Sequence, residues 1–253
     1  MNTISFMSAN YVAREVGYAM RGWGHGDRAT NEAFRPLETY EQRLAELLGD
    51  IRALGFGAID LWGAHLNPEW ASAEHVEIAR RLLAQHRLRV ATIEVFVDRA
   101  HLERACEIAL AVGTSVIAGF APVDAAALLR ERGLRLGVEN HPEQTPDELL
   151  AKIGDNGAAV DTGWFATQGY DPVRAIEELG DRIVHVHLKD VLHPGEPHDT
   201  CRWGRGVVDV EGCVRALQRI GYTGAISVEH EPEHEDPSED CRAMREQLEG
   251  WLR

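Results

Sequence analysis

Four short apolar segments in the second half of the chain each end near an acidic residue or a histidine. Their sequences are GVENH (137–141), VDT (160–162), HVH (185–187) and VEH (228–230). Side chains alternate between the two faces of a strand, so the polar residue at each end projects away from the apolar face of its own strand. The four residues with this parity are Glu139, Asp161, His187 and Glu229.

Such strands recur along the whole chain and alternate with helical patterns. The predicted strands are 4–8, 58–62, 90–95, 115–119, 134–139, a strand ending at 161, 183–188 and 225–229. The predicted helices are one closed by Gly55, 73–86, 102–112, 124–132, two beginning at Pro146 and Pro172, 210–220 and 238–252. Eight alternating units favour a single (β/α)₈ TIM barrel over residues 1–253 rather than an open doubly wound sheet.

In such a barrel, the carboxyl ends of the strands meet at one mouth, where the active site lies. Three carboxylates and one imidazole would then converge, and they repel one another unless a positive charge lies among them. Oxygen-rich ligation with one imidazole predicts one divalent metal ion held by the four residues of matching parity. Mn²⁺ is the preferred ion, with Mg²⁺, Co²⁺ or Zn²⁺ as alternatives.

Composition limits the partners of the chain. The formal net charge is −15, and a field of that sign repels phosphate backbones, so nucleic acid is not an expected partner. No apolar run is long enough to cross a bilayer, and the amino terminus lacks the pattern of a secretion signal, so we expect no membrane partner and a cytoplasmic location. The four cysteines show no paired spacing and are expected to be reduced thiols.

Residues 14–36 form a polar, glycine-containing stretch without clear periodicity. Its place after the first strand puts it over the predicted mouth, and a loop of this length is usually functional or disordered. We interpret it as a lid or substrate wall, with a solvated insertion as the alternative.

The motifs GVENH, AAVDTGW, HVHLKD, Trp203–Gly206 before Val208-Asp209, and SVEHE together resemble the sugar phosphate isomerase/epimerase group of xylose isomerase-like TIM barrels. The resemblance covers nearly the whole chain, and its motifs are specific in the second half. It implies the same metal ligands as strand parity: Glu139, Asp161, His187 and Glu229. It also implies a small carbohydrate substrate. Whether the protein forms a homo-oligomer is left open.

In ketose epimerases of this group, two metal-bound glutamates act as an acid/base pair, which here would be Glu139 and Glu229. Many relatives carry a histidine where this chain has Trp164, and that departure weakens any assignment to one free sugar. The resemblance implies proton abstraction next to a carbonyl through a metal-stabilised enediolate. Proton return to the opposite face epimerises, return to the neighbouring carbon isomerises, and loss of a leaving group makes the reaction an elimination.

Metal ligation lowers the basicity of a carboxylate, so two histidines compete for the acid/base role. They are His141 and His185, with structural roles as their alternatives. The other candidate substrate-binding residues are Trp62, His65, Glu94, Trp164, Lys189 and Arg205. Lys189 could instead neutralise Asp60 or Glu94. The acidic stretch 231–236 is interpreted as a solvated loop, with another metal site as the alternative.

The leading hypothesis is therefore a metal-dependent isomerase or epimerase of a sugar, keto-sugar or polyol-derived ketone. A lyase on the same scaffold, either an inosose-type dehydratase or a 3-keto-glycoside eliminase, is the alternative. DNA-repair endonucleases also use this barrel, but they need a basic surface, which the net charge of −15 opposes. A ligand-binding barrel without activity is disfavoured by the presence of all four expected ligands.

Overall fold

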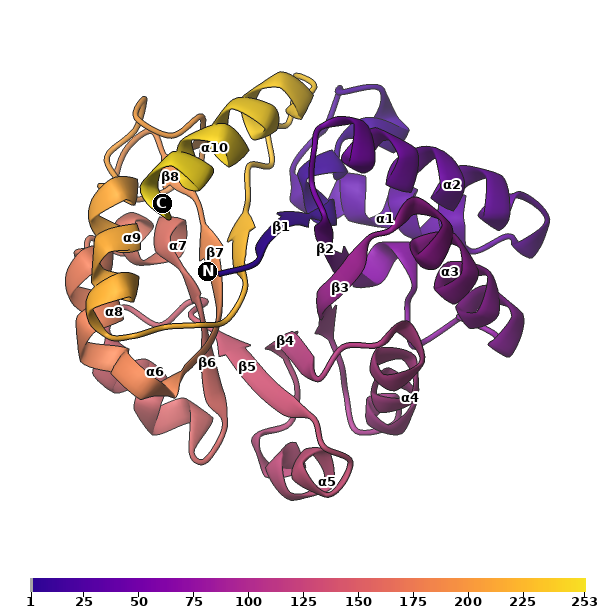
Figure 1. The fold of residues 1–253 in the computed structure, drawn as a ribbon, viewed down its shortest axis with the longest axis horizontal. Coiled ribbons are helices and arrows are strands. Elements are labelled where there is room, and N and C mark those ends of the chain that lie inside the picture. Colours follow the sequence, from indigo (N-terminus) through magenta and orange to yellow (C-terminus); the bar gives the residue numbers. More distant parts are fainter. Residues whose placement is uncertain (1) are drawn as a thin grey trace.

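The computed structural model describes residues 2–253, and a closed barrel of eight parallel strands lies at its centre (Figure 1). The order around the barrel is β1-β10-β7-β6-β5-β4-β3-β2, which closes because β1 pairs with both β2 and β10. The (β/α)₈ prediction is confirmed. The barrel strands are β1 Ile4–Met7, β2 Ala58–Trp62, β3 Arg89–Phe96, β4 Val116–Phe120, β5 Arg135–Glu139, β6 Gly157–Asp161, β7 Ile183–Leu188 and β10 Ile226–Val228.

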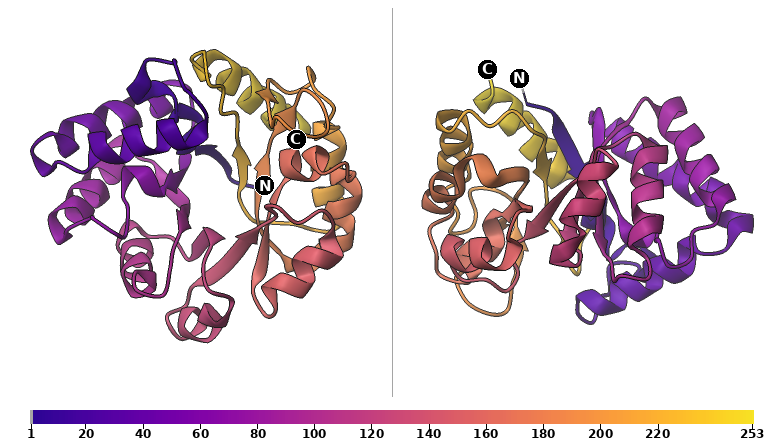
Figure 2. Two further views of the ribbon diagram at one scale, coloured as in Figure 1. Left: turned by 180° about the vertical axis from the view of Figure 1, so that it is seen from behind. Right: turned by 90° about the horizontal axis from the view of Figure 1, so that it is seen from below.

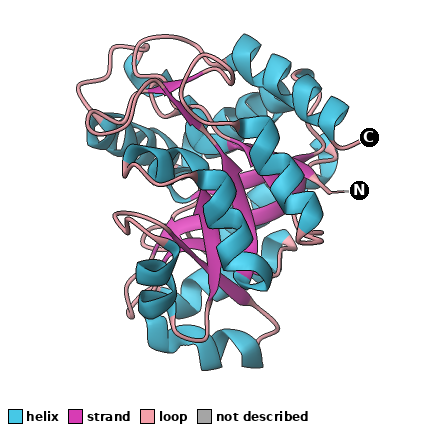
Figure 3. Cartoon of the chain, turned by 90° about the vertical axis from the view of Figure 1, so that its left-hand side faces the viewer, coloured by secondary structure: helices cyan, strands magenta, loops and turns pink. Residues whose placement is uncertain are grey.

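Helices surround the strands, and the cyan layer encloses the magenta strands in Figure 3. Figure 2 shows the same arrangement from behind and below, with the two termini close together. The apolar face of each strand packs on this layer, as Ile59 and Leu61 of β2 show by their burial. The α-helices are α1 Trp23–Phe34, α2 Leu37–Ala53, α3 Ala73–His86, α4 Leu102–Val112, α5 Ala126–Glu131, α6 Pro146–Ile153, α7 Thr162–Thr167, α8 Pro172–Leu179, α9 Val210–Arg219 and α10 Ser238–Trp251.

Side-chain caps fix the start of several helices. Thr145 accepts a hydrogen bond from the Glu148 backbone N–H (3.3 Å) before Pro146 opens α6. Asp171 accepts one from the Val173 N–H (2.9 Å) at the start of α8. Each capping side chain accepts a hydrogen bond from a backbone N–H of the first turn, which has no carbonyl partner within the helix. Proline suits the first turn because it has no backbone N–H that would be left unpaired.

Residues 14–36 are not an irregular loop as a whole, because they contain the twelve-residue helix α1. Its buried positions are Gly26, Thr30 and Phe34, spaced four apart. Of these three buried residues, Phe34 is the one with a large apolar side chain. The buried face of the helix therefore produces no hydrophobic periodicity in the sequence. Contact is close at Gly26, where a Cβ atom would lie 2.4 Å from the Val12 carbonyl oxygen.

Two further features near the mouth were not predicted. The short helix α7 begins directly after β6, and a two-stranded antiparallel ribbon follows β7. The ribbon consists of β8 Asp190–Val191 and β9 Thr200–Cys201. The last barrel strand is also shorter than predicted, so Glu229 lies one residue beyond its end.

Within residues 2–253, none of the helices combines the length and the apolar character that crossing a bilayer requires. All four cysteines are buried free thiols.

The packing of α1 predicts a large difference between two glycine substitutions in the same helix. Gly26→Ala places a methyl group against the Val12 carbonyl and should destabilise the protein by about 1–3 kcal/mol through overpacking. At Gly24 the added Cβ would meet only the Arg28 guanidinium, at 3.6 Å, so Gly24→Ala should be neutral or stabilising. Urea-induced unfolding of the two variants measures the difference, and equal midpoints would contradict the packing argument.

Candidate active site

A pocket of about 730 Å³ opens at the carboxyl ends of the barrel strands. Pockets of this size commonly hold a small-molecule ligand. Most of the candidate residues predicted from the sequence line it. They are Trp62, Glu94, Glu139, His141, Trp164, His187, Lys189 and Glu229.

The floor of this pocket is organised around the His187 imidazole. Its Nδ1 lies 3.5 Å from a carboxylate oxygen of Glu139 and 3.2 Å from one of Glu229. Its Nε2 lies 3.4 Å from Glu94, on the other side of the ring. His187 is 1% exposed, and it has register partners Asp161 on β6 and Ser227 on β10. The barrel register therefore places one imidazole among carboxylates from three other strand ends.

Asp161 divides its two oxygens between the fold and the pocket floor. Oδ1 accepts the backbone N–H groups of Gly163 (2.7 Å) and Trp164 (3.1 Å) as the cap of α7. Oδ2 is buried and has no hydrogen-bond partner, although the Lys189 Nζ lies 3.0 Å away. Asn140 fixes the backbone here by exchanging hydrogen bonds of 2.7 and 3.0 Å with Asp161. One oxygen of Asp161 is thus held in place while the other faces the site.

Lys189 supplies the second positive charge at this floor. Its Nζ lies 3.0 Å from Asp161, 3.1 Å from Glu229 and 3.3 Å from Glu231. The sequence-based alternative that Lys189 neutralises Asp60 or Glu94 is wrong, since its ion-pair partners are these three carboxylates. Glu231 was also misjudged as part of a solvated loop, because its side chain is only 9% exposed.

The crowded charges shift the protonation of the floor residues. Burial would lower the pKa of His187, but the carboxylates of Glu229 and Glu94 raise that pKa well above its usual value. Burial raises the pKa of Glu229 well above its ordinary range, against the opposing effects of Lys189 and His187. Burial would raise the pKa of Asp161, but Lys189 together with His198 and His187 lowers it overall. Glu229 therefore keeps a proton to a higher pH than an exposed glutamate does.

Below His187, a buried pair closes the barrel interior. His185 Nε2 lies 2.8 Å from Asp60 Oδ2, and both residues are at most 1% exposed. The His185 ring meets the His187 ring edge-on, with centroids 4.8 Å apart. Burial would raise the pKa of Asp60, but the adjacent His185 lowers it overall. His185 is therefore a partner of Asp60 beneath the floor and is not among the residues that line the pocket.

Trp164 forms part of the pocket wall, between two histidine rings. His141 stacks on it with centroids 3.9 Å apart, and His198 does so at 3.8 Å. Two imidazoles this close to one centroid and this nearly parallel to the indole must lie on opposite faces. Both faces are thus covered, so a substrate can reach only the edge of Trp164 and cannot stack on its ring.

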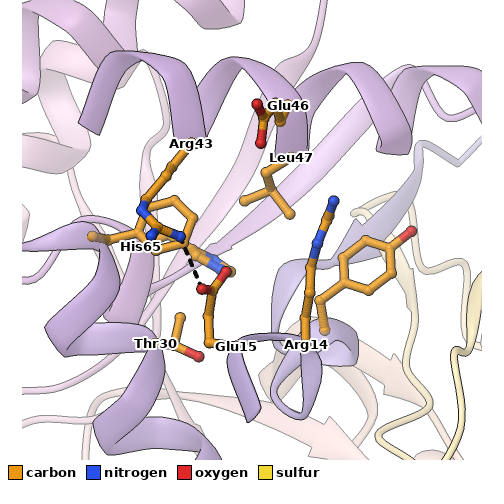
Figure 4. A pocket seen from close by; sticks show the side chains of 9 residues that line it. Arg14, Glu15, Thr30, Arg43, Glu46, Leu47 and His65 are labelled. Carbon is orange, nitrogen blue, oxygen red and sulfur yellow. Dashed lines mark hydrogen bonds and ion pairs between the residues drawn. The ribbon is translucent and has the colours of Figure 1, made fainter. Parts of the chain in front are cut away.

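Besides His185, two more of the predicted substrate-binding residues are not part of this pocket. Arg205 is exposed and does not line it. His65 lines a separate cavity of about 30 Å³ beneath α1 and α2, shown in Figure 4 beside the Arg43–Glu15 ion pair of 2.9 Å. There, His65 Nδ1 lies 3.0 Å from the Ser8 hydroxyl. Burial lowers the pKa of His65 to about 3, as expected for a neutral structural histidine.

Two residues of the site were missed. Glu231 lies two residues after Glu229, so the same parity argument could have placed it at the mouth. His198 belongs to the loop between β8 and β9, where its Nδ1 lies 2.7 Å from the Thr167 hydroxyl. No strand periodicity positions that loop, and the sequence offered no signal for His198.

The residues of the floor fit a divalent cation. One ligating atom from each of Glu139, Asp161 and His187 lies within 4.8 Å of the other two. His187 Nδ1, Asp161 Oδ2 and Glu229 Oε2 are buried and make no hydrogen bond, although each has an ion-pair neighbour at 3.0–3.2 Å. Buried carboxylates gathered around one imidazole and one ammonium group are a donor set that a divalent cation can bind.

The sequence matches the family model described as xylose isomerase-like TIM barrel over residues 48–247. The chain belongs to this family. A curated relative, inosose dehydratase of Geobacillus kaustophilus, is 36% identical over 77 residues, which are 27% of this chain and 25% of that protein. Such alignments span well under two thirds of the curated relatives' length.

Solved structures of low sequence identity share the fold. A xylose isomerase-like TIM barrel protein from Mycobacterium smegmatis, in complex with magnesium, has a TM-score of 0.73 and 19% identity, covering 100% of this chain and 97% of that one. The structure of an L-ribulose 3-epimerase has a TM-score of 0.70 and 18% identity, covering 100% and 95%.

The burial of His65 predicts a pH dependence of stability. Its pKa is about 3 in the folded protein and about 6.5 in the unfolded chain, so the unfolded state binds the extra proton between these values. Stability from this residue is therefore present above pH 6.5 and is lost by about 1.4 kcal/mol per pH unit below it. Urea unfolding at pH 7 and pH 5 should show a smaller acid loss for His65→Gln than for the exposed control His234→Gln. Equal losses would contradict this role.

The charges of the floor predict unequal roles for Lys152 and Lys189, the only two lysines in the sequence. Lys189→Met leaves buried carboxylates without their cation and should destabilise the chelator-treated protein by about 3 kcal/mol. Within residues 2–253, Lys152 pairs with Glu143 alone, and the two side chains are 26% and 13% exposed, so Lys152→Met should cost less than Lys189→Met, about 1 kcal/mol. Thermal unfolding measures both, and Mn²⁺ should raise the melting temperature of Lys189→Met more than that of the wild type. A loss of stability in Lys189→Met no larger than that in Lys152→Met would argue that Lys189 does not compensate the charge of the buried carboxylates.

Proposed function

We propose that this protein is a divalent-metal-dependent isomerase or epimerase of a keto-sugar or polyol-derived ketone. The observation that carries the proposal is the grouping of Glu139, Asp161 and His187, each of which offers a ligating atom within 4.8 Å of the other two, with Glu229 Oε2 3.2 Å from His187 Nδ1. These four residues would hold the ion, with Mn²⁺ preferred and Mg²⁺, Co²⁺ or Zn²⁺ as alternatives. When bound, the ion supplies Lewis-acid polarisation of the substrate carbonyl.

The two glutamates are the proposed acid/base pair. They come from β5 and from the end of β10, and each lies within 3.5 Å of the same His187 nitrogen. One carboxylate accepts the proton from the carbon next to the carbonyl, and the other returns a proton from its own side. Burial of Glu229 raises its pKa, and this effect opposes the lowering of basicity that metal ligation causes.

Lys189 and His141 have supporting roles in this proposal. The Lys189 ammonium group lies among three carboxylates on the floor and can donate a hydrogen bond to an oxygen that gains negative charge when the proton leaves. His141 is exposed at the pocket wall and is fixed by its stack on Trp164. It is therefore the one predicted histidine base that both lines the pocket and is reachable from it, whereas His185 is buried against Asp60.

A lyase is the second candidate, and the shape of the pocket favours it. A volume of about 730 Å³ exceeds what a single free sugar fills, and the rim includes the exposed apolar side chains of Phe96 and Leu192. These would suit an apolar group attached to a keto-sugar. In that reaction one of the two glutamates removes the proton from the carbon next to the carbonyl. The bond between the neighbouring carbon and its oxygen substituent then breaks, and the other glutamate donates a proton to the departing oxygen.

Incubation of the Mn²⁺-loaded protein with keto-sugars and inososes in deuterated water separates the two reactions. Isomerisation or epimerisation incorporates deuterium at the carbon next to the carbonyl and keeps all heavy atoms of the substrate. Elimination releases water or an aglycone, which mass spectrometry detects. Absence of both exchange and release across these substrates would contradict the proposed proton abstraction.

Glu229→Gln should abolish turnover, with a loss of at least about 10³-fold, because an amide cannot accept the proton and ligates metal poorly. Circular dichroism should show an unchanged fold. Glu239→Gln, at an exposed position of α10, is the matched control and should keep full activity. Activity of Glu229→Gln close to that of the control would remove Glu229 from the mechanism.

A further inference from the structure

A second group of metal-binding residue types lies at one wall of the pocket. It consists of His230, Glu235 and Asp240, which each offer one ligating atom within 4.8 Å of the other two. These residues come from the end of the last barrel strand, from the loop that follows it, and from the first turn of α10. None of them belongs to the floor cluster around His187.

His230 is the residue that points to a ligand. It is 1% exposed, and its Nε2 is buried without a hydrogen-bond partner. Its Nδ1 lies 3.1 Å from the Thr200 hydroxyl, which fixes the orientation of the ring. Metal-bound histidines are commonly held in this way through their second nitrogen.

The unpaired nitrogen faces a carboxylate with a free oxygen. Asp240 Oδ2 lies 3.9 Å from His230 Nε2, which is too long for a hydrogen bond. Asp240 Oδ1 is turned to the Arg202 guanidinium, 3.4 Å away, so the two oxygens have separate neighbours. Two ligands bound to one Zn²⁺ ion at about 2.0–2.1 Å lie about 3.3 Å apart in tetrahedral geometry, and a small side-chain shift reaches that spacing.

We propose that His230, Glu235 and Asp240 form a second cation site, for a divalent transition-metal ion of the Zn²⁺ type. One imidazole and two carboxylates balance a charge of +2, and the nitrogen ligand favours Zn²⁺ or Co²⁺ over Mg²⁺. Water completes the coordination on the exposed side, where Glu235 lies.

The position of the site gives it a structural role. The loop 231–235 lines the substrate pocket, and it carries no regular secondary structure. An ion at this site ties that loop to both the barrel and α10. It therefore fixes the pocket wall, including Glu231, without contributing to the chemistry at the floor.

Metal stoichiometry tests the proposal. The chelator-treated full-length protein is dialysed against excess Zn²⁺, and bound zinc is measured by elemental analysis. The double variant Glu235→Gln/Asp240→Asn should bind one ion per chain fewer than the wild type. The variant Glu233→Gln/Glu239→Gln, which changes two nearby carboxylates outside the site, should bind as many as the wild type.

Hydrogen exchange locates the bound ion. In a Glu139→Gln/Asp161→Asn background, which disables the floor cluster, Zn²⁺ should still slow amide exchange in residues 231–240 at least tenfold. Adding the Glu235→Gln/Asp240→Asn changes should remove that protection. Equal zinc content in the wild type and the double variant, or no added protection, would overturn the second site whether or not the floor binds a metal.

Discussion

The structure depends on balancing negative charge that is buried inside the mouth of the barrel. Glu94, Asp161 and Glu229 are each at most 5% exposed, and carboxylates this close cannot all stay ionised without cations among them. His187 and Lys189 supply that positive charge, and each contacts three carboxylates. A divalent ion would add to the same balance and release protons as it binds.

Much of the architecture and of the floor could be predicted from the sequence because both follow period-two alternation. An apolar residue on the outer strand face directs its neighbours inward, and Glu139 and Asp161 lie on the inner side of the barrel beside His187 as this rule predicts. The same rule explains the buried contact of Asp60 with His185 across the barrel. The metal and the catalytic roles stay proposals, because strand alternation predicts which way a side chain points and does not predict what it binds or which reaction it takes part in.

The rest depended on contacts that local pattern does not encode. Helix α1 was missed because its buried stripe begins with Gly26, which packs on backbone and carries no hydrophobic signal. The stack of His141, Trp164 and His198 joins three separate connections, so no single segment predicts it. Lys189 was placed at the mouth, but its partner Glu231 was not, because an acidic run looks like a solvated loop until a buried cation is known to face it.

Closure of the barrel between β1 and β10 affects how the chain matures. During synthesis, β1 is made before the other barrel strands, and its neighbour β10 is the last of them to appear. Glu229 follows β10 directly, so the floor is assembled only when the cylinder closes. A nascent chain that stops before β10 therefore exposes an unpaired strand edge and holds an incomplete set of carboxylates. The proposed metal site and the closed barrel are completed in one step.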